Sequence, residues 1–101
     1  MAKGYWIAHV EVTDPDGYKK YVAANGVAFA KYGARFLVRG GQHVVKAGHA
    51  RPRHVVIEFR DYATALACHD SEEYQAAAKQ RDAASAVDLV IVEGYDGPQP
   101  V

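Results

Sequence analysis

The sequence contains one cysteine, Cys68, and no stretch that approaches the roughly 20 apolar residues of a membrane span. A single cysteine cannot form an internal disulfide, which is typical of proteins in a reducing compartment. No long apolar run follows the first lysine in MAKGYW, so we expect no secretory signal. These absences predict a cytoplasmic protein without a membrane segment.

The sequence also lacks an excess of charge of either sign. Twelve Lys and Arg residues balance twelve Asp and Glu residues, so the formal net charge is zero. A protein without a net positive field does not attract nucleic acid or an anionic membrane over long range. The basic cluster Arg51-Pro52-Arg53-His54 is too short to follow a phosphate backbone. We therefore predict no nucleic-acid partner.

The amino-acid composition is typical of a globular domain. The chain has 101 residues, of which 50% are hydrophobic and 24% are charged. This length suffices for one modest core, and the sequence shows no repeat, linker or low-complexity segment. We predict a single domain over residues 1–101.

The hydrophobic periodicity changes several times along the chain. Alternation with period 2 predicts four strands, near residues 5–12, 34–39, 53–59 and 87–94. Helical spacing predicts helices near residues 14–32 and 61–82. Within residues 61–82, Ser71 is predicted to be the N-cap of a second helical segment. We expect a bulge or kink at Gly40-Gly41 and a continuation of the second strand through residues 43–46. Gly26 lies inside the first helix, where only close packing offers a reason for it.

The order strand, helix, strand, strand, helix, strand predicts an α+β, ferredoxin-like fold. In this plan a four-stranded antiparallel sheet carries both helices on one face. Alternation assigns a nearly pure apolar set to the face under the helices: Trp6, Ala8, Val10, Phe36, Val38, Val55, Ile57, Phe59, Val90 and Val92.

The opposite, non-helical face is predicted to mix aliphatic and polar side chains. The aliphatic members are Ile7, Leu37, Val56, Leu89 and Ile91, and the polar members are His9, Glu11, Arg35, Arg39, His54, Glu58 and Glu93. So many aliphatic residues would form a large apolar patch on a monomer, which predicts that a second copy covers this face. A solvated face with scattered aliphatic residues is the alternative.

The chain resembles a bacterial family, domain of unknown function 1330, within the dimeric α/β barrel superfamily. The stretches that carry the resemblance are GYWIAHVEVTDPDGYKKY, KYGARFLVRGG, RPRHVVIEF, SEEYQAAAKQR and DLVIVEGYDGPQP. The resemblance implies a homodimer whose two sheets pair by their non-helical faces into a barrel, and it implies no reaction. The sequence departs from the family at Gly33-Ala34 and at His69, a position that is more often aromatic.

Arg39 and Glu58 are the first candidates for chemistry, because alternation places both on the non-helical face of adjacent strands. At a dimer seam, the arginine could hold a substrate carboxylate or enolate through two hydrogen bonds. A buried carboxylate with a raised pKa could act as a general base. A structural ion pair inside the barrel is the alternative.

His9 and His54 fall on the same predicted face and are candidates for a proton shuttle near neutral pH. Both could equally be core or interface histidines without a catalytic role. His43, His49 and His54 follow no familiar ligand spacing, so we predict no metal and no cofactor.

Tyr18, Tyr21, Tyr32 and Tyr74 could line a cleft between the helices and the sheet. We take Tyr18 and Tyr74, together with Arg35, as candidate substrate-binding residues. An aromatic stripe of the core is the alternative for the tyrosines.

The sequence is compatible with three functions. One is a cofactor-independent enzyme acting on a small organic acid or aromatic ketone, by analogy of fold. The second is a non-catalytic module that binds a small metabolite. The third is a structural or accessory homodimer whose polar face has no ligand.

Overall fold

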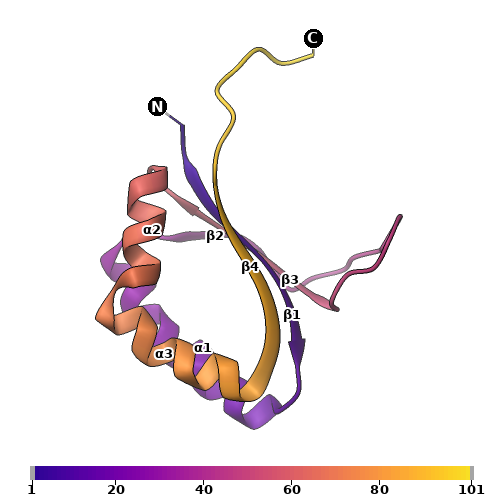
Figure 1. Ribbon diagram of the computed structural model, residues 1–101, viewed down its shortest axis with the longest axis vertical. Helices are drawn as coiled ribbons and strands as arrows, with labels where there is room; N and C mark the ends of the chain where they lie inside the picture. The colour runs from indigo at the N-terminus through magenta and orange to yellow at the C-terminus, as the bar shows by residue number, and fades with distance from the viewer. Residues whose placement is uncertain (1, 101) are drawn as a thin grey trace.

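Four strands form one antiparallel sheet, and three helices cover one of its faces in the computed structural model, which describes residues 2–100 (Figure 1). The strands are β1 (Gly4–Val12), β2 (Arg35–Arg39), β3 (Arg53–Phe59) and β4 (Ser85–Glu93). The helices are α1 (Pro15–Lys31), α2 (Tyr62–Asp70) and α3 (Glu72–Ala84). The strand order β2-β3-β1-β4 confirms the predicted α+β, ferredoxin-like plan. None of the helices in residues 2–100 has the length and hydropathy needed to cross a membrane.

Short polar side chains start all three helices. Asp14 accepts a hydrogen bond from the backbone of Gly17, and Asp61 accepts one from Thr64. Ser71 Oγ accepts one from the backbone N–H of Tyr74 at 3.1 Å, which confirms its predicted role as an N-cap. Ser71 has an extended backbone, so the helix predicted over residues 61–82 is two helices that meet there.

The connection between β2 and β3 differs from the prediction. Residues 43–46 form no strand, and the whole segment between the two strands extends away from the sheet (Figure 1). Gly40 and Gly41 have φ angles of 74° and 92°, a region that glycine adopts easily, and they end β2 rather than bend it. The bulge lies earlier, between Phe36 and Val38.

This bulge reverses the faces of the last residues of β2. Phe36 pairs with Ile57, but Val38 pairs with Val56 and Arg39 pairs with Val55. An extra residue in one strand shifts the alternation by one position. Arg39 therefore lies on the helical face, and the prediction that it shares a face with Glu58 is wrong.

The faces of β4 are also the reverse of those predicted. Ala8 pairs with Leu89 and Trp6 with Ile91, so these two residues of β4 face the helices. Val90 and Val92 lie on the non-helical face, where 58% and 41% of their surfaces are exposed. Four consecutive apolar residues, Leu89 to Val92, carry no alternation, so only the register with β1 could decide their orientation.

The core lies between the sheet and the helices around Trp6, which is 2% exposed. Its ring meets the rings of Phe29, Phe59 and Tyr74 at centroid distances of 5.3, 5.4 and 4.8 Å. Its Nε1 donates a hydrogen bond of 2.9 Å to the carbonyl of Ala65. The burial of this large aromatic group, with its polar atom satisfied, joins β1 to all three helices.

Candidate functional site

A cavity of about 40 Å³ lies between the helices and the sheet. Aromatic and aliphatic side chains form most of its wall, among them Trp6, Ala8, Val10, Val22, Phe29, Phe36, Val55, Ile57, Val87 and Leu89. Its polar lining comes from two helices and two strands and consists of Tyr18, Tyr21, Asn25, Arg39, Arg53, Tyr74 and Arg81. The lining residues include no carboxylate and no histidine. An apolar wall with a few convergent polar groups is typical of a small-molecule site.

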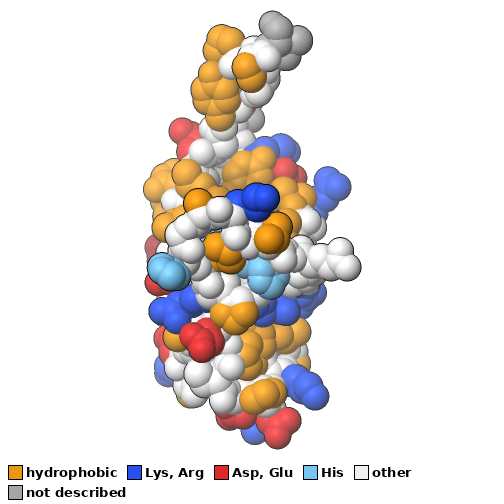
Figure 2. Space-filling model, turned by 90° about the vertical axis from the view of Figure 1, so that its right-hand side faces the viewer, with side chains coloured by type: hydrophobic (Ala, Val, Ile, Leu, Met, Phe, Trp, Pro, Cys, Tyr) orange, Lys and Arg blue, Asp and Glu red, His pale blue; other side chains and the backbone are white. Residues whose placement is uncertain are grey.

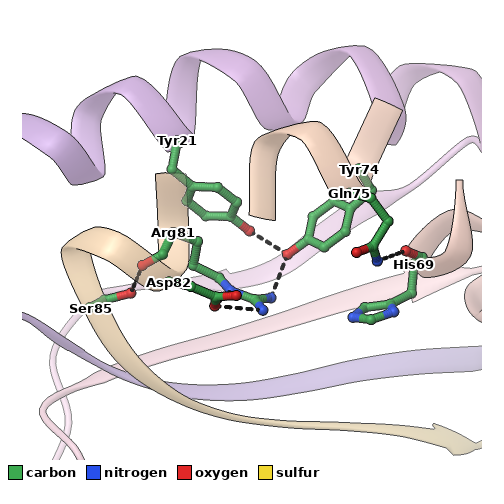
Figure 3. A network of polar contacts seen from close by, with 7 residues as sticks. All are labelled: Tyr21, His69, Tyr74, Gln75, Arg81, Asp82 and Ser85. Atoms are coloured by element: carbon green, nitrogen blue, oxygen red, sulfur yellow. Dashed lines mark hydrogen bonds and ion pairs between the residues drawn. The ribbon is translucent and has the colours of Figure 1, made fainter. Parts of the chain in front are cut away.

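Tyr21, Tyr74 and Arg81 form a hydrogen-bonded chain at this cavity (Figure 3). The two phenolic oxygens are 2.7 Å apart, and Arg81 Nη1 donates to Tyr74 Oη at 2.9 Å. Burial raises the pKa of both phenols, so both keep their protons at neutral pH.

The hydrogen bond between the two phenols uses only one of their two hydroxyl protons. Each hydroxyl carries one proton, and one of the two protons makes the hydrogen bond between them. Tyr74 Oη already accepts a hydrogen bond from Arg81. These two contacts leave one phenolic proton over, and either the Asn25 side chain, which interacts with Tyr21 at the same cavity, or an oxygen atom of a ligand can accept it.

The three arginines of the cavity differ in how they are paired. Arg81 donates from Nε and Nη2 to Asp82 at 3.1 and 3.0 Å. Within residues 2–100, no carboxylate pairs with Arg39 or Arg53. The guanidinium of Arg39 lies over the ring of Phe36, with Cζ 4.0 Å from the ring centroid. The cavity wall therefore holds two cations without a paired anion.

A second group of polar side chains lies on the non-helical face. His9 and His54 are opposite each other in the sheet, and their Nδ1 atoms are 2.8 Å apart. The ring of His43 lies 4.6 Å from that of His54, centroid to centroid. Partial burial lowers the pKa of His54, and the charges of His43 and His9 lower it further. Neutral imidazoles fit this contact, since one must donate and the other accept.

Glu58 lies on the same non-helical face as these histidines, away from the cavity. It pairs in register with Tyr5 and Arg35, and Tyr5 Oη donates to Glu58 Oε2 at 3.3 Å. The sheet thus separates Glu58 from Arg39, and the predicted Arg39–Glu58 pair does not form.

The candidate residues predicted from the sequence divide between the two faces of the sheet. Arg39, Tyr18 and Tyr74 line the cavity. The remaining four lie on the non-helical face: His9, Arg35, His54 and Glu58. The helical and non-helical faces therefore cannot form one site within a single chain.

The prediction missed Arg53 and Arg81. Alternation from Arg53 through Val55 and Ile57 placed Arg53 on the helical face, and this signal was in the sequence. Arg81 lies seven residues after Tyr74, a spacing that puts both on one side of a helix. Only the fold shows that both side chains reach the same cavity.

Metal and thiol chemistry find no support in the described residues. Within residues 2–100, no group of three or more His, Cys, Asp or Glu side chains is placed to hold a metal ion. Cys68 is fully buried, and burial raises the pKa of its thiol to about 12. A thiol in this state supplies no thiolate nucleophile at neutral pH.

The chain is similar to proteins of the same fold. The model of the family described as "Domain of unknown function (DUF1330)" matches residues 3–95. No curated protein matches the chain. The structure of RPA0582, a protein of unknown function from Rhodopseudomonas palustris, is 16% identical, covers 95% of this chain and 85% of its own, and has a TM-score of 0.76.

Two further solved structures share the fold at lower similarity. SnoaB, described as a cofactor-independent oxygenase from Streptomyces nogalater, is 12% identical over 100% of both chains, with a TM-score of 0.61. A protein of unknown function from Thermobifida fusca, described as dimeric and ferredoxin-like, is 18% identical over 91% of this chain and 89% of its own, with a TM-score of 0.59.

Proposed function

The chain belongs to the DUF1330 family, whose description names no reaction, and we propose that it binds a small organic acid or ketone in the cavity between its helices and its sheet. The observation that carries this proposal is the chain of Tyr21, Tyr74 and Arg81 inside an otherwise apolar wall. The phenolic proton that these two contacts leave over can be donated to a carbonyl or carboxylate oxygen of a ligand.

Binding without reaction is the function that the lining residues support best. Phenols and guanidinium groups donate hydrogen bonds to oxygen, but at neutral pH none of them removes a proton from a ligand. Because the lining contains no carboxylate and no histidine, it supplies donors and no general base.

A cofactor-independent reaction on a small organic acid or aromatic ketone is the second candidate. The arrangement that favours it is the same donor chain, because fixed donors at a carbonyl oxygen also stabilise the negative charge of an enolate. In this reaction Arg39 would bind the carboxylate of an acid, and Tyr18 would contact the body of the substrate. The resemblance of fold to SnoaB is an analogy that favours this candidate without identifying a reaction.

We further propose that the chain works as a homodimer joined by the non-helical face, in a cytoplasmic compartment that suits its one thiol. This face carries Ile7, Val38, Val56, Val90 and Val92, and apolar side chains lie beside histidine and basic groups on the corresponding side of the molecule (Figure 2). Burial of about 800 Å² per chain would be typical of a stable pair. His9, His54, Glu58 and Arg35 would then belong to the dimer seam. An accessory dimer without a ligand is the remaining alternative.

The test of ligand binding uses Tyr74→Phe, which removes one hydroxyl and keeps the ring. Thermal shift with a panel of small acids and ketones should raise the Tm of the wild type for some members. The affinity for those members should fall about tenfold in Tyr74→Phe, because a hydrogen bond contributes roughly 0.5–1.5 kcal/mol. Tyr95→Phe is the matched control, since Tyr95 is 70% exposed and lies outside the cavity.

A panel with no binder at millimolar concentration would contradict the proposed function. Incubation of each binder with the protein in air, without added cofactor, separates the two candidates. Loss of the ligand over time, detected by mass spectrometry and abolished in Tyr74→Phe, would establish the enzyme. A bound ligand that is recovered unchanged would establish the binding module.

A further inference from the structure

Arg53 carries the one buried polar side-chain atom of residues 2–100 that has no hydrogen-bond partner. This atom is Nε, which is shielded from solvent while the residue as a whole is half-buried. A buried N–H of a charged group that makes no hydrogen bond destabilises the folded state, and folded proteins rarely contain one. Either a water or an atom of a ligand would satisfy this N–H, and Arg53 is one of the residues that line the cavity.

The Arg53 guanidinium lies near Tyr18 and Gly40. The Cα partner of Arg53 is Val10, so its side chain starts on the helical face. Its Cζ lies 5.6 Å from the centroid of the Tyr18 ring. On another side lies Gly40, where an added Cβ would stand 3.0 Å from Nη1. Contact through the face of a guanidinium leaves its in-plane N–H groups available.

The charge of the cavity favours an anion. Arg39 and Arg53 both line it, and neither is paired with a carboxylate of residues 2–100. A planar carboxylate matches the fork of a guanidinium and accepts two parallel hydrogen bonds from it. Such a group would satisfy Nε of Arg53 and balance positive charge at the same time.

The volume of the cavity limits the size of the anion. One water needs roughly 10–15 Å³ of such space, so this cavity of about 40 Å³ has room for about three. That space suits the three heavy atoms of a carboxylate group, so the chain of a short carboxylic acid would extend beyond it along the wall. The apolar wall beside it, formed by residues such as Val22, Phe29 and Leu89, suits an alkyl chain.

We propose that the ligand is a short-chain carboxylic acid whose carboxylate is bound by Arg53, with Arg39 beside it. This assignment rests on the proposed function, because it names the class of molecule that the cavity takes. It selects the acid over the ketone, and it gives Arg53 the role of anchor.

The experiment compares sodium butyrate with butanone, two probes of similar length that differ in charge, by calorimetric titration of the full chain. The wild type should bind butyrate at least tenfold more tightly than butanone. Arg53→Gln should weaken butyrate at least tenfold and leave butanone within about twofold. Arg60→Gln is the matched control, because Arg60 lies outside the cavity and its side chain is 81% exposed, and it should leave the affinity for both probes unchanged.

The outcomes separate the inference from the function on which it rests. Equal affinity for both probes in the wild type, or butyrate binding that is unchanged in Arg53→Gln, would overturn the acid assignment and leave the cavity as a site for neutral molecules. The comparison of probes in the wild type needs no variant, so it holds even if Arg53→Gln does not fold. Binding of neither probe would overturn the proposed function as well. Inorganic phosphate that binds as tightly as butyrate, and depends equally on Arg53, would replace the carboxylate with a phosphate group.

Discussion

At the scale of one residue, Gly26 costs its helix about 1 kcal/mol relative to alanine, because glycine loses more backbone entropy on folding. It lies inside α1, and close packing was the only reason that the sequence suggested for it. The residue is exposed, and no atom lies within 4 Å of the position that a Cβ would take. The glycine therefore has no packing role within the described chain.

Gly26→Ala should stabilise the protein by about 1 kcal/mol, because alanine loses less backbone entropy in a helix. Urea denaturation, monitored by the fluorescence of Trp6, measures the change. The matched control is Gly4→Ala, where an added Cβ would collide with the backbone of Asp61 and should destabilise the fold. A loss of stability in Gly26→Ala would show that another chain covers this position.

At the scale of the elements, two short irregularities place the cavity residues. The bulge in β2 turns Arg39 toward the helices, and the break at Ser71 separates α2 from α3. Ser71 Oγ accepts from the N–H of Tyr74 and donates to the carbonyl of Cys68 at 2.7 Å. One side chain thus ends one helix and begins the next, three residues before Tyr74, whose hydroxyl accepts a hydrogen bond from Arg81.

Ser71→Ala should lower the free energy of unfolding by about 1–2 kcal/mol, the usual effect of losing an N-cap. Ligand affinity should stay within about twofold, because Ser71 does not line the cavity. Thermal denaturation and titration of the same preparation measure both quantities. A tenfold loss of affinity in a protein of unchanged stability would instead make Ser71 part of the site.

At the scale of the whole molecule, the proposed homodimer depends on the non-helical face. Val56 lies in the middle of this face, opposite Ile7 on one side and Val38 on the other. If a second copy covers it, Val56→Asp would bury a carboxylate without a partner. Light scattering should then give a dimer for the wild type and a monomer for Val56→Asp at micromolar concentration.

Val27→Asp is the matched control for this assembly, because Val27 is 64% exposed on α1, on the other side of the sheet. It should remain a dimer. A wild type that is monomeric at micromolar concentration would exclude the proposed pair.

The stability of the whole molecule should also depend on pH through the histidines of this face. The pKa of His54 is below its ordinary value of 6.5 in the folded state, so the unfolded chain binds the proton more tightly. Stability should therefore be fully present above pH 6.5 and should decrease as the pH falls through the pKa of the folded state. His9 and His43 lie against this group.

Urea midpoints at pH 8, 6.5 and 5 measure this dependence, and His54→Asn should reduce it. His49→Asn is the control, since His49 is exposed and does not contact His54 in the described chain. An identical decrease in wild type and His54→Asn would assign the effect to other groups.

The sequence by itself determined the order of the strands and helices, because each depends on local periodicity, caps and glycines that act within a few residues. It therefore predicted the ferredoxin-like plan, and the tyrosines Tyr18 and Tyr74 that line the cavity. The tertiary structure alone decided which face Arg39 and the residues Leu89 to Val92 occupy. A bulge of one residue and a run without alternation leave orientation open, and only pairing with a neighbouring strand fixes it. For that reason the candidate site lies at the cavity that Arg53 and Arg81 share with Tyr74, whereas Glu58 lies on the non-helical face.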